Sequence, residues 1–165
     1  MQSAALRILV TGGTFDKNYD ELEGRLLFRE TQVPEMLRLG RSRLGITVET
    51  LMLIDSLEMT DLHRARIVEA CRNAPEQRIV ITHGTDTMEH TARAVGAAKL
   101  SKTVVLTGAM VPYTFGSSDG LFNLGSALAF VQTLPFGTYV AMNGRCFDWD
   151  SVFKNRGTGV FEERV

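Results

Sequence analysis

Residues 6–15 read LRILVTGGTF. The first five form a short apolar run that Gly12 and Gly13 end, which predicts a buried strand followed by a tight turn. Four further segments are apolar, rich in β-branched residues and mostly continuous, as expected of strands covered on both faces. They are Thr47–Leu53 (TVETLML), Arg78–Thr82 (RIVIT), Thr103–Thr107 (TVVLT) and Gly137–Met142 (GTYVAM).

Helical patterns lie between these strands, over Val33–Arg41, Thr60–Asn73, Thr87–Leu100 and Phe122–Leu134. Thr60 is the expected N-cap of the second helix, because a threonine hydroxyl can accept a hydrogen bond from the free N–H groups of the first turn. The order β-α-β-α-β-α-β-α-β predicts one α/β domain over residues 1–165. We expect a doubly wound, three-layer fold with a mainly parallel sheet, similar to flavodoxin and Rossmann folds.

Two stretches do not follow this alternation. Thr14–Phe28 is long and polar and is expected to hold a mobile loop and a hairpin, whereas Met110–Gly120 is expected to be irregular. Ligands of doubly wound folds bind beyond the carboxyl ends of the strands. We therefore predict that five segments converge there: Thr11–Phe15, Ile54–Glu58, His83–Met88, Gly108–Pro112 and Asn143–Lys154.

The composition is that of a soluble globular protein, and it gives no indication of a strongly charged binding partner. The 165 residues include 18 basic and 19 acidic ones, and no basic stripe is present, so we expect neither nucleic acid nor a membrane as partner. Arg38, Arg41 and Arg43 are interpreted as a solvated face. No apolar run reaches the ~20 residues of a membrane helix. Met1–Val10 lacks the pattern of a signal peptide, so a cytoplasmic location is expected.

Cysteine and histidine residues give no indication of a metal site. Cys71 and Cys146 are far apart in the sequence and are expected to be free thiols in a reducing compartment. The three histidines do not form a zinc pattern. No metal and no cofactor is therefore expected.

Two motifs and one lysine place hydroxyl and charged groups at the predicted carboxyl edge of the sheet. TGGT at 11–14 is either a structural turn or a site presenting Thr14; the phosphate-binding patterns GxGxxG and GxxxxGK[ST] are absent. In HGTDTME at 83–89, Gly84 allows a ligand to approach the main chain, and Thr85 and Asp86 are either N-caps of the next helix or site residues. Lys154 is either a solvated surface group or a base in a partly buried pocket.

Taken together, these motifs resemble the bacterial-type L-asparaginase family. The resemblance rests on TGGT (11–14), HGTDTMEHTA (83–92), LTGAM (106–110), SSDGLFNL (117–124) and MNG (142–144) followed by Lys154. It covers nearly the whole chain but only the amino-terminal catalytic domain of the family. The carboxyl-terminal domain of the family is thus expected to be absent.

The resemblance implies a hydrolase that converts L-asparagine to L-aspartate and ammonia. It implies that Thr14 is the nucleophile, that Tyr19 activates it, and that Thr85 is a second essential threonine supported by Lys154, with Asp86 bridging the set. It also implies a substrate-binding group: Ser56 with Asp55 for the α-carboxylate, Asp86 for the α-amino group, Gly84 for main-chain approach, and Ala109, whose carbonyl accepts from the leaving amide.

The chain also departs from the family pattern. Leu57 stands where a polar residue is usual, and Val111 and Tyr113 replace the usual arginine and serine. Two alternatives therefore remain: hydrolysis of glutamine or another small amide, and a non-catalytic module that binds an amino acid. A homo-oligomer, dimer or tetramer, is expected, because apolar surface freed by the missing domain would be covered by another copy.

Overall fold

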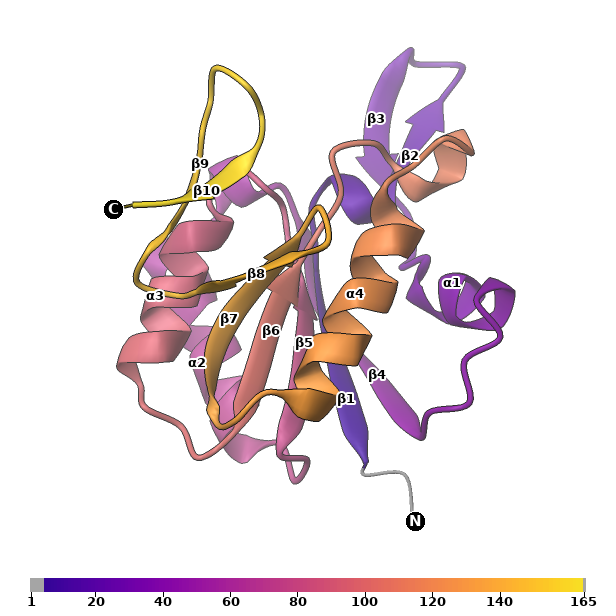
Figure 1. The fold of residues 1–165 in the computed structure, drawn as a ribbon. Helices are drawn as coiled ribbons and strands as arrows, with labels where there is room; N and C mark the ends of the chain where they lie inside the picture. The colour runs from indigo at the N-terminus through magenta and orange to yellow at the C-terminus, as the bar shows by residue number, and fades with distance from the viewer. Residues whose placement is uncertain (1–4, 165) are drawn as a thin grey trace.

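The computed structural model describes residues 5–164, so the first four residues of the N-terminal segment lie outside it. A six-stranded sheet crosses the molecule in the order β4-β1-β5-β6-β7-β8, and all neighbours are parallel except β7 and β8 (Figure 1). The parallel strands follow the flavodoxin-like order, which confirms the predicted fold class. The strands are β1 (Leu6–Gly12), β4 (Ile46–Ile54), β5 (Arg78–Thr82), β6 (Thr103–Thr107), β7 (Gly137–Met142) and β8 (Arg145–Asp148).

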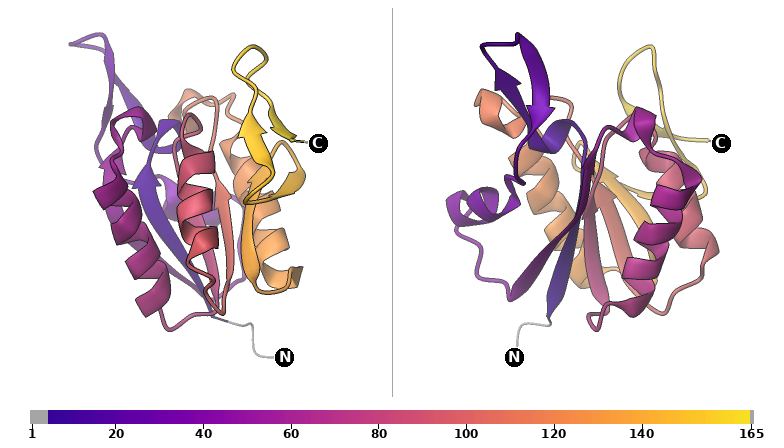
Figure 2. Two further views of the ribbon diagram at one scale, coloured as in Figure 1. Left: turned by 90° about the vertical axis from the view of Figure 1, so that its left-hand side faces the viewer. Right: turned by 180° about the vertical axis from the view of Figure 1, so that it is seen from behind.

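Helices cover both faces of the sheet, with α2 and α3 on one face and α1 and α4 on the other (Figures 1 and 2). Each face encloses its own apolar core, because the strands are hydrophobic on both sides. The helices are α1 (Val33–Leu39), α2 (Asp61–Asn73), α3 (Met88–Ala97) and α4 (Gly120–Thr133). Three single 3-10 turns add to them: η1 (Thr14–Asp16), η2 (Ser56–Glu58) and η3 (Tyr113–Phe115).

The predicted helices are all present, with bounds that differ by up to three residues. Thr60 is the N-cap of α2, as predicted, and its N–H donates to Nδ1 of His63 at 3.0 Å. Helix α3 ends three residues before the predicted Leu100, because Lys99 adopts a left-handed φ of 48°. Helix α4 begins two residues earlier than predicted, at Gly120, whose N–H donates to Oγ of Ser118.

The expected hairpin within Thr14–Phe28 is formed by β2 (Lys17–Asp20) and β3 (Arg25–Phe28). The segment Asn143–Lys154, predicted to lie beyond the last parallel strand, has regular structure of its own. It contains the antiparallel edge strand β8 and then β9 (Val152–Lys154), which pairs with β10 (Phe161–Glu163).

Asn143 and Gly144, with φ of 57° and 76°, form the tight turn into β8. An Asn-Gly pair between strands is a strong hairpin signal, so the sequence contains the information needed to predict this turn.

Two further observations concern the described part of the chain. Over residues 5–164, no helix combines the length and the apolar character needed to cross a membrane. Cys71 and Cys146 are both free thiols, as predicted.

Asn123 of α4 joins two turns at the carboxyl edge of the sheet. Its fully buried side chain donates from Nδ2 to the Gly108 carbonyl at 2.9 Å and accepts at Oδ1 from the Asn143 N–H at 3.1 Å. Asn123→Ala would leave buried backbone groups unpaired, and we expect it to lower the free energy of unfolding by about 3 kcal/mol. Urea denaturation at equilibrium measures this change. The exposed Asn73→Ala is the control, with an expected loss under ~0.5 kcal/mol; equal losses for both variants would contradict the assignment.

Candidate active site

The turns that follow β1, β4 and β5 are in backbone contact at the carboxyl edge of the sheet. A Cβ on residue 13 would lie 2.3 Å from the nitrogen of Gly84, and a Cβ on residue 84 would lie 2.6 Å from Oγ of Ser56. Only glycine fits such approaches. Consequently the turns that carry Thr14, Ser56 and Thr85 are placed side by side.

Two more glycines extend this contact. A Cβ on residue 12 would meet the Ile54 nitrogen at 2.5 Å, and one on residue 108 would meet the His83 carbonyl oxygen at 2.3 Å. Gly12 and Gly13 also have positive φ, at 99° and 76°, which side chains rarely adopt. The TGGT turn is thus required by the packing itself, and it presents Thr14 at the same time.

Lys154 lies beside Thr85 and Asp86. Its Nζ donates to Thr85 Oγ1 and to Asp86 Oδ1, both at 2.8 Å. The lysine side chain is only 9% exposed, so the interpretation as a solvated surface group is wrong. The alternative that Thr85 or Asp86 caps α3 is also wrong, because Thr87 occupies the N-cap position.

Asp86 has a second cationic neighbour that the sequence analysis did not single out. Nη1 of Arg156 lies 3.8 Å from Asp86 Oδ1, and its Nη2 donates to the Asp86 carbonyl at 2.9 Å. Thr85 in turn donates to the sulfur of Met110 at 3.6 Å. The hydroxyl of Thr85 therefore has Lys154 as donor and a weak acceptor on its other side.

Thr14 opens η1 and is partly exposed. The turn is fixed by Asp16, whose buried carboxylate accepts from the Gln32 N–H at 2.8 Å. Tyr19, on β2, is 56% exposed, and within residues 5–164 no hydrogen bond joins it to Thr14. Its hydroxyl lies instead 4.0 Å from where a Cβ of Gly24 would be. Tyr19 is thus close to Thr14 in the sequence but is not hydrogen-bonded to it in the described structure.

Asp55 and Ser56 differ in their availability. Asp55 accepts from Nζ of Lys17 at 2.5 Å and from the Leu57 N–H at 3.0 Å. Burial opposes its ionisation, but these two donors outweigh burial and lower the pKa of the Asp55 carboxyl. The buried Ser56 hydroxyl, by contrast, has no hydrogen-bond partner among the described residues. Ser56 is therefore free to bind a ligand, whereas Asp55 is occupied by an ion pair.

His83 orients the chain at the Gly84 turn. Burial lowers the pKa of its imidazole to about 4, so the ring is neutral at pH 7 and carries one N–H. Nδ1 lies 2.7 Å from the Gly84 carbonyl, which can only accept, so Nδ1 carries the hydrogen. Nε2 then accepts from the Thr91 hydroxyl at 2.7 Å. Within the described chain, the N–H groups of Gly84 and Thr85 donate to no protein acceptor and are free to bind an oxyanion.

The remaining predicted residue, Ala109, is fully buried in the turn after β6. Sequence reasoning missed Arg64, which is nearly buried on α2. Its Nη2 donates to the Thr87 hydroxyl at 3.1 Å, and Thr87 donates to the Ser56 carbonyl at 2.8 Å. No motif marked Arg64, because Thr87, the partner that links it to the site, lies 23 positions away in the sequence.

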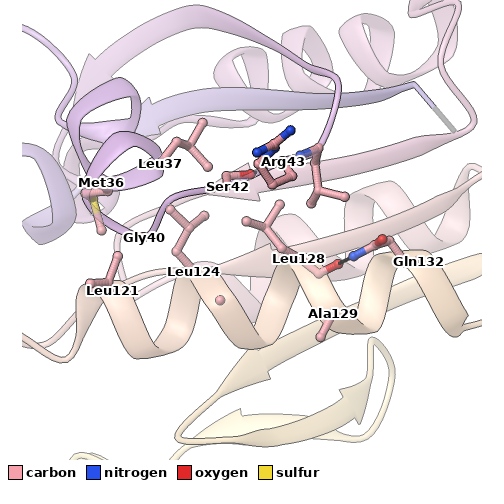
Figure 3. A pocket seen from close by; sticks show the side chains of 12 residues that line it. Met36, Leu37, Gly40, Ser42, Arg43, Leu121, Leu124, Leu128, Ala129 and Gln132 are labelled. Atoms are coloured by element: carbon pink, nitrogen blue, oxygen red, sulfur yellow. Dashed lines mark hydrogen bonds between the residues drawn. The ribbon is translucent and has the colours of Figure 1, made fainter. Parts of the chain in front are cut away.

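A separate pocket of about 410 Å³ lies between α1 and α4 (Figure 3). Leucine side chains and Met36 make most of its wall, and none of the predicted site residues lines it. In the described part of the chain, no group of three or more His, Cys, Asp or Glu residues could hold a metal ion. The β2–β3 and β9–β10 hairpins both project at the carboxyl edge of the sheet, where the turns of the candidate site lie (Figure 1).

Known proteins are similar to this chain in sequence. A "Probable L-asparaginase periplasmic" of Haemophilus influenzae is 38% identical over 136 residues, which are 78% of this chain and 37% of that protein. A component of the glutamyl-tRNA(Gln) amidotransferase of Methanococcus vannielii is 36% identical over 156 residues, or 87% of this chain and 35% of that protein. One relative is thus named as periplasmic, and the compartment of this chain stays a prediction.

The solved structure of "the thermostable L-asparaginase from Thermococcus kodakarensis" superposes with a TM-score of 0.82 at 32% identity, over 96% of this chain and 51% of that one. This chain therefore spans about a third to a half of the length of the relatives it matches. A family model described as "Asparaginase, N-terminal" matches residues 5–160. The chain belongs to the asparaginase family, in which it corresponds to the N-terminal region.

Proposed function

We propose that this chain hydrolyses the side-chain amide of L-asparagine to L-aspartate and ammonia. The observation that carries the proposal is the Lys154–Thr85–Asp86 contact, with both nitrogen–oxygen distances at 2.8 Å, beside the Thr14 turn in a member of the asparaginase family. The extent of the domain, residues 1–165, is part of the proposal, as is assembly into a dimer or tetramer.

In the first half-reaction, Thr14 Oγ attacks the amide carbon. A threonine hydroxyl is a weak nucleophile until a base accepts its proton. The C–N bond then breaks, the amide nitrogen takes up a proton and leaves as ammonia, and an ester to Thr14 remains. Free N–H groups of Gly84 and Thr85 would stabilise the oxyanion. Tyr19 is the proposed base, and to act it would have to move from its exposed position toward Thr14.

In the second half-reaction, water hydrolyses this ester and restores the Thr14 hydroxyl. We assign Lys154 to orient and polarise Thr85, which directs the water. The free Ser56 hydroxyl would bind the α-carboxylate of the substrate. Asp86 would bind the α-amino group of the substrate, which would compete with Arg156 for the Asp86 carboxylate. Asp55 would act through its ion pair with Lys17, which holds the Ser56 turn.

Alanine at either threonine tests the nucleophilic scheme. We expect Thr14→Ala and Thr85→Ala each to lower kcat for asparagine by ~10³-fold or more, because Thr14 forms the ester and Thr85 directs the water that hydrolyses it. Ammonia release measures the effect. Thr133→Ala, on the exposed end of α4, is the matched control and should keep full activity. Retention of activity in Thr14→Ala would exclude the proposed ester.

Lys154→Met tests the role of the ammonium group. We expect kcat to fall by ~10²–10⁴-fold, the usual range for loss of acid–base assistance. The folded state should persist, which circular dichroism measures, because the methionine stem fills the same space. Lys99→Met, an exposed lysine, serves as control. Equal kcat for the two variants would remove Lys154 from the mechanism.

One observation favours an alternative substrate, glutamine or another small amide. Leu57, next to Ser56, is an apolar residue where the family pattern has a polar one. Its side chain is 66% exposed. A relative named for glutamyl-tRNA(Gln) amidotransfer also shares this domain. Ranking asparagine, glutamine and small amides by kcat/KM decides between the substrates. Calorimetric binding of asparagine without turnover of any amide would instead support a non-catalytic binding module.

A further inference from the structure

The segment that carries Lys154 is not part of the main sheet. Strand β9 pairs only with β10, and each has three residues. A two-stranded pair of this size is marginal by itself. The alignment of the lysine therefore depends on what β9 packs against, and Figure 2 shows that this neighbour is α3.

One stripe of α3 contacts this segment at three successive points. Glu89, Arg93 and Gly96 stand at i, i+4 and i+7 and so share one face of the helix. The Lys154 N–H donates to Glu89 Oε2 at 2.9 Å, and Arg93 Nη2 donates to the Val152 carbonyl at 3.2 Å.

The third contact is steric. A Cβ on residue 96 would lie 2.2 Å from Cδ2 of Trp149, so the indole lies directly on the glycine. Residues 149, 152 and 154 thus run antiparallel to positions 96, 93 and 89 of α3. These three contacts fix the position of the segment along α3 and its direction relative to the helix.

The partners of the lysine amine lie in the turn that leads into the same helix. Thr85 and Asp86 directly precede α3, and the Glu89 side chain, 14% exposed, lies in its first turn. Both ends of the Lys154–Thr85 contact are therefore attached to one rigid element. A carboxylate accepting a backbone N–H forms a charge-assisted hydrogen bond, among the stronger contacts available.

We propose that the stripe Glu89–Arg93–Gly96 positions Lys154, with Glu89 as the principal positioning residue. Glu89 acts through the main chain of Lys154 and does not contact the reacting atoms. The catalytic consequence rests on the proposed amide hydrolysis, whereas the positioning itself can be measured without it.

The test compares Glu89→Ala with Glu89→Gln, whose amide oxygen still accepts the Lys154 N–H. We expect Glu89→Ala to lower kcat by ~10–100-fold with KM within ~3-fold, because the amine is displaced while substrate-binding groups stay in place. Glu89→Gln should remain within ~3-fold of the wild type in both constants. Glu69→Ala, in an exposed pair on α2, is the control for loss of a helical glutamate.

A second readout does not need activity. Acetic anhydride labels lysine amines, and mass spectrometry compares Lys154 with the exposed Lys99 in the same molecule. In Glu89→Ala the relative labelling of Lys154 should rise ~10-fold, the change expected when the hydrogen bond to the Lys154 N–H is lost. Glu89→Gln and Glu69→Ala should label like the wild type.

Gly96→Ala provides a variant far from the reacting atoms. Alanine normally favours a helix over glycine, but here its methyl group must displace Trp149. We expect higher labelling of Lys154 and a lower kcat, and expect Gly96→Ala combined with Trp149→Leu to reverse both.

If the wild type releases no ammonia but the labelling pattern holds, the positioning role stands and the proposed function fails. If the wild type is active and Glu89→Ala matches it in kcat and labelling, the inference is overturned. Loss of kcat in Glu89→Gln equal to that in Glu89→Ala also overturns it, because charge rather than the hydrogen bond would then matter.

Discussion

The site depends on the direct contact of main chains at the carboxyl edge of the sheet. The turns after β1 and β5 meet where Gly13 lies against Gly84, at a separation that leaves no room for a Cβ. A side chain at residue 13 would collide with the main chain of Gly84, and one at residue 84 would collide with Ser56 in the turn after β4. The distance between the two threonine hydroxyls is thus set by backbone packing rather than by flexible side chains, which suits a site that needs fixed geometry.

The elements around this contact differ in how firmly they are held. Strands β1, β5 and β6 are buried on both faces, and α3 leads directly out of the Thr85 turn. The β2–β3 hairpin is attached mainly at its base, by the Lys17–Asp55 ion pair and by a bond from Thr114 to the Lys17 carbonyl at 3.2 Å. The Thr85–Lys154 half of the site is therefore joined to the core by more contacts than the hairpin of the Thr14–Tyr19 half.

Burial also determines which polar groups can act. His83 is fully buried and neutral, and its imidazole holds the Gly84 carbonyl, while the N–H groups of Gly84 and Thr85 have no acceptor within residues 5–164. Ser56 is equally buried, yet its hydroxyl has no partner within residues 5–164. An unpaired buried hydroxyl costs free energy in the absence of a ligand. Three other buried atoms among the described residues, Asp16 Oδ2, Arg64 Nε and Thr82 Oγ1, share this property, so the role of Ser56 depends on its place beside Gly84.

The sequence by itself determined the fold class, five strands, four helices and the edge at which they converge, because apolar periodicity and strand–helix alternation are local signals. It also indicated Thr14, Thr85, Asp86 and Lys154 through short motifs. Only the tertiary structure decided that Asp55 is engaged by Lys17 and that Tyr19 lies apart from Thr14. Likewise it alone revealed Arg64 and Glu89 as supports. The Lys17–Asp55, Arg64–Thr87 and Glu89–Lys154 contacts join residues more than twenty positions apart. Their formation depends on how strands and helices pack and leaves no periodic pattern in the sequence.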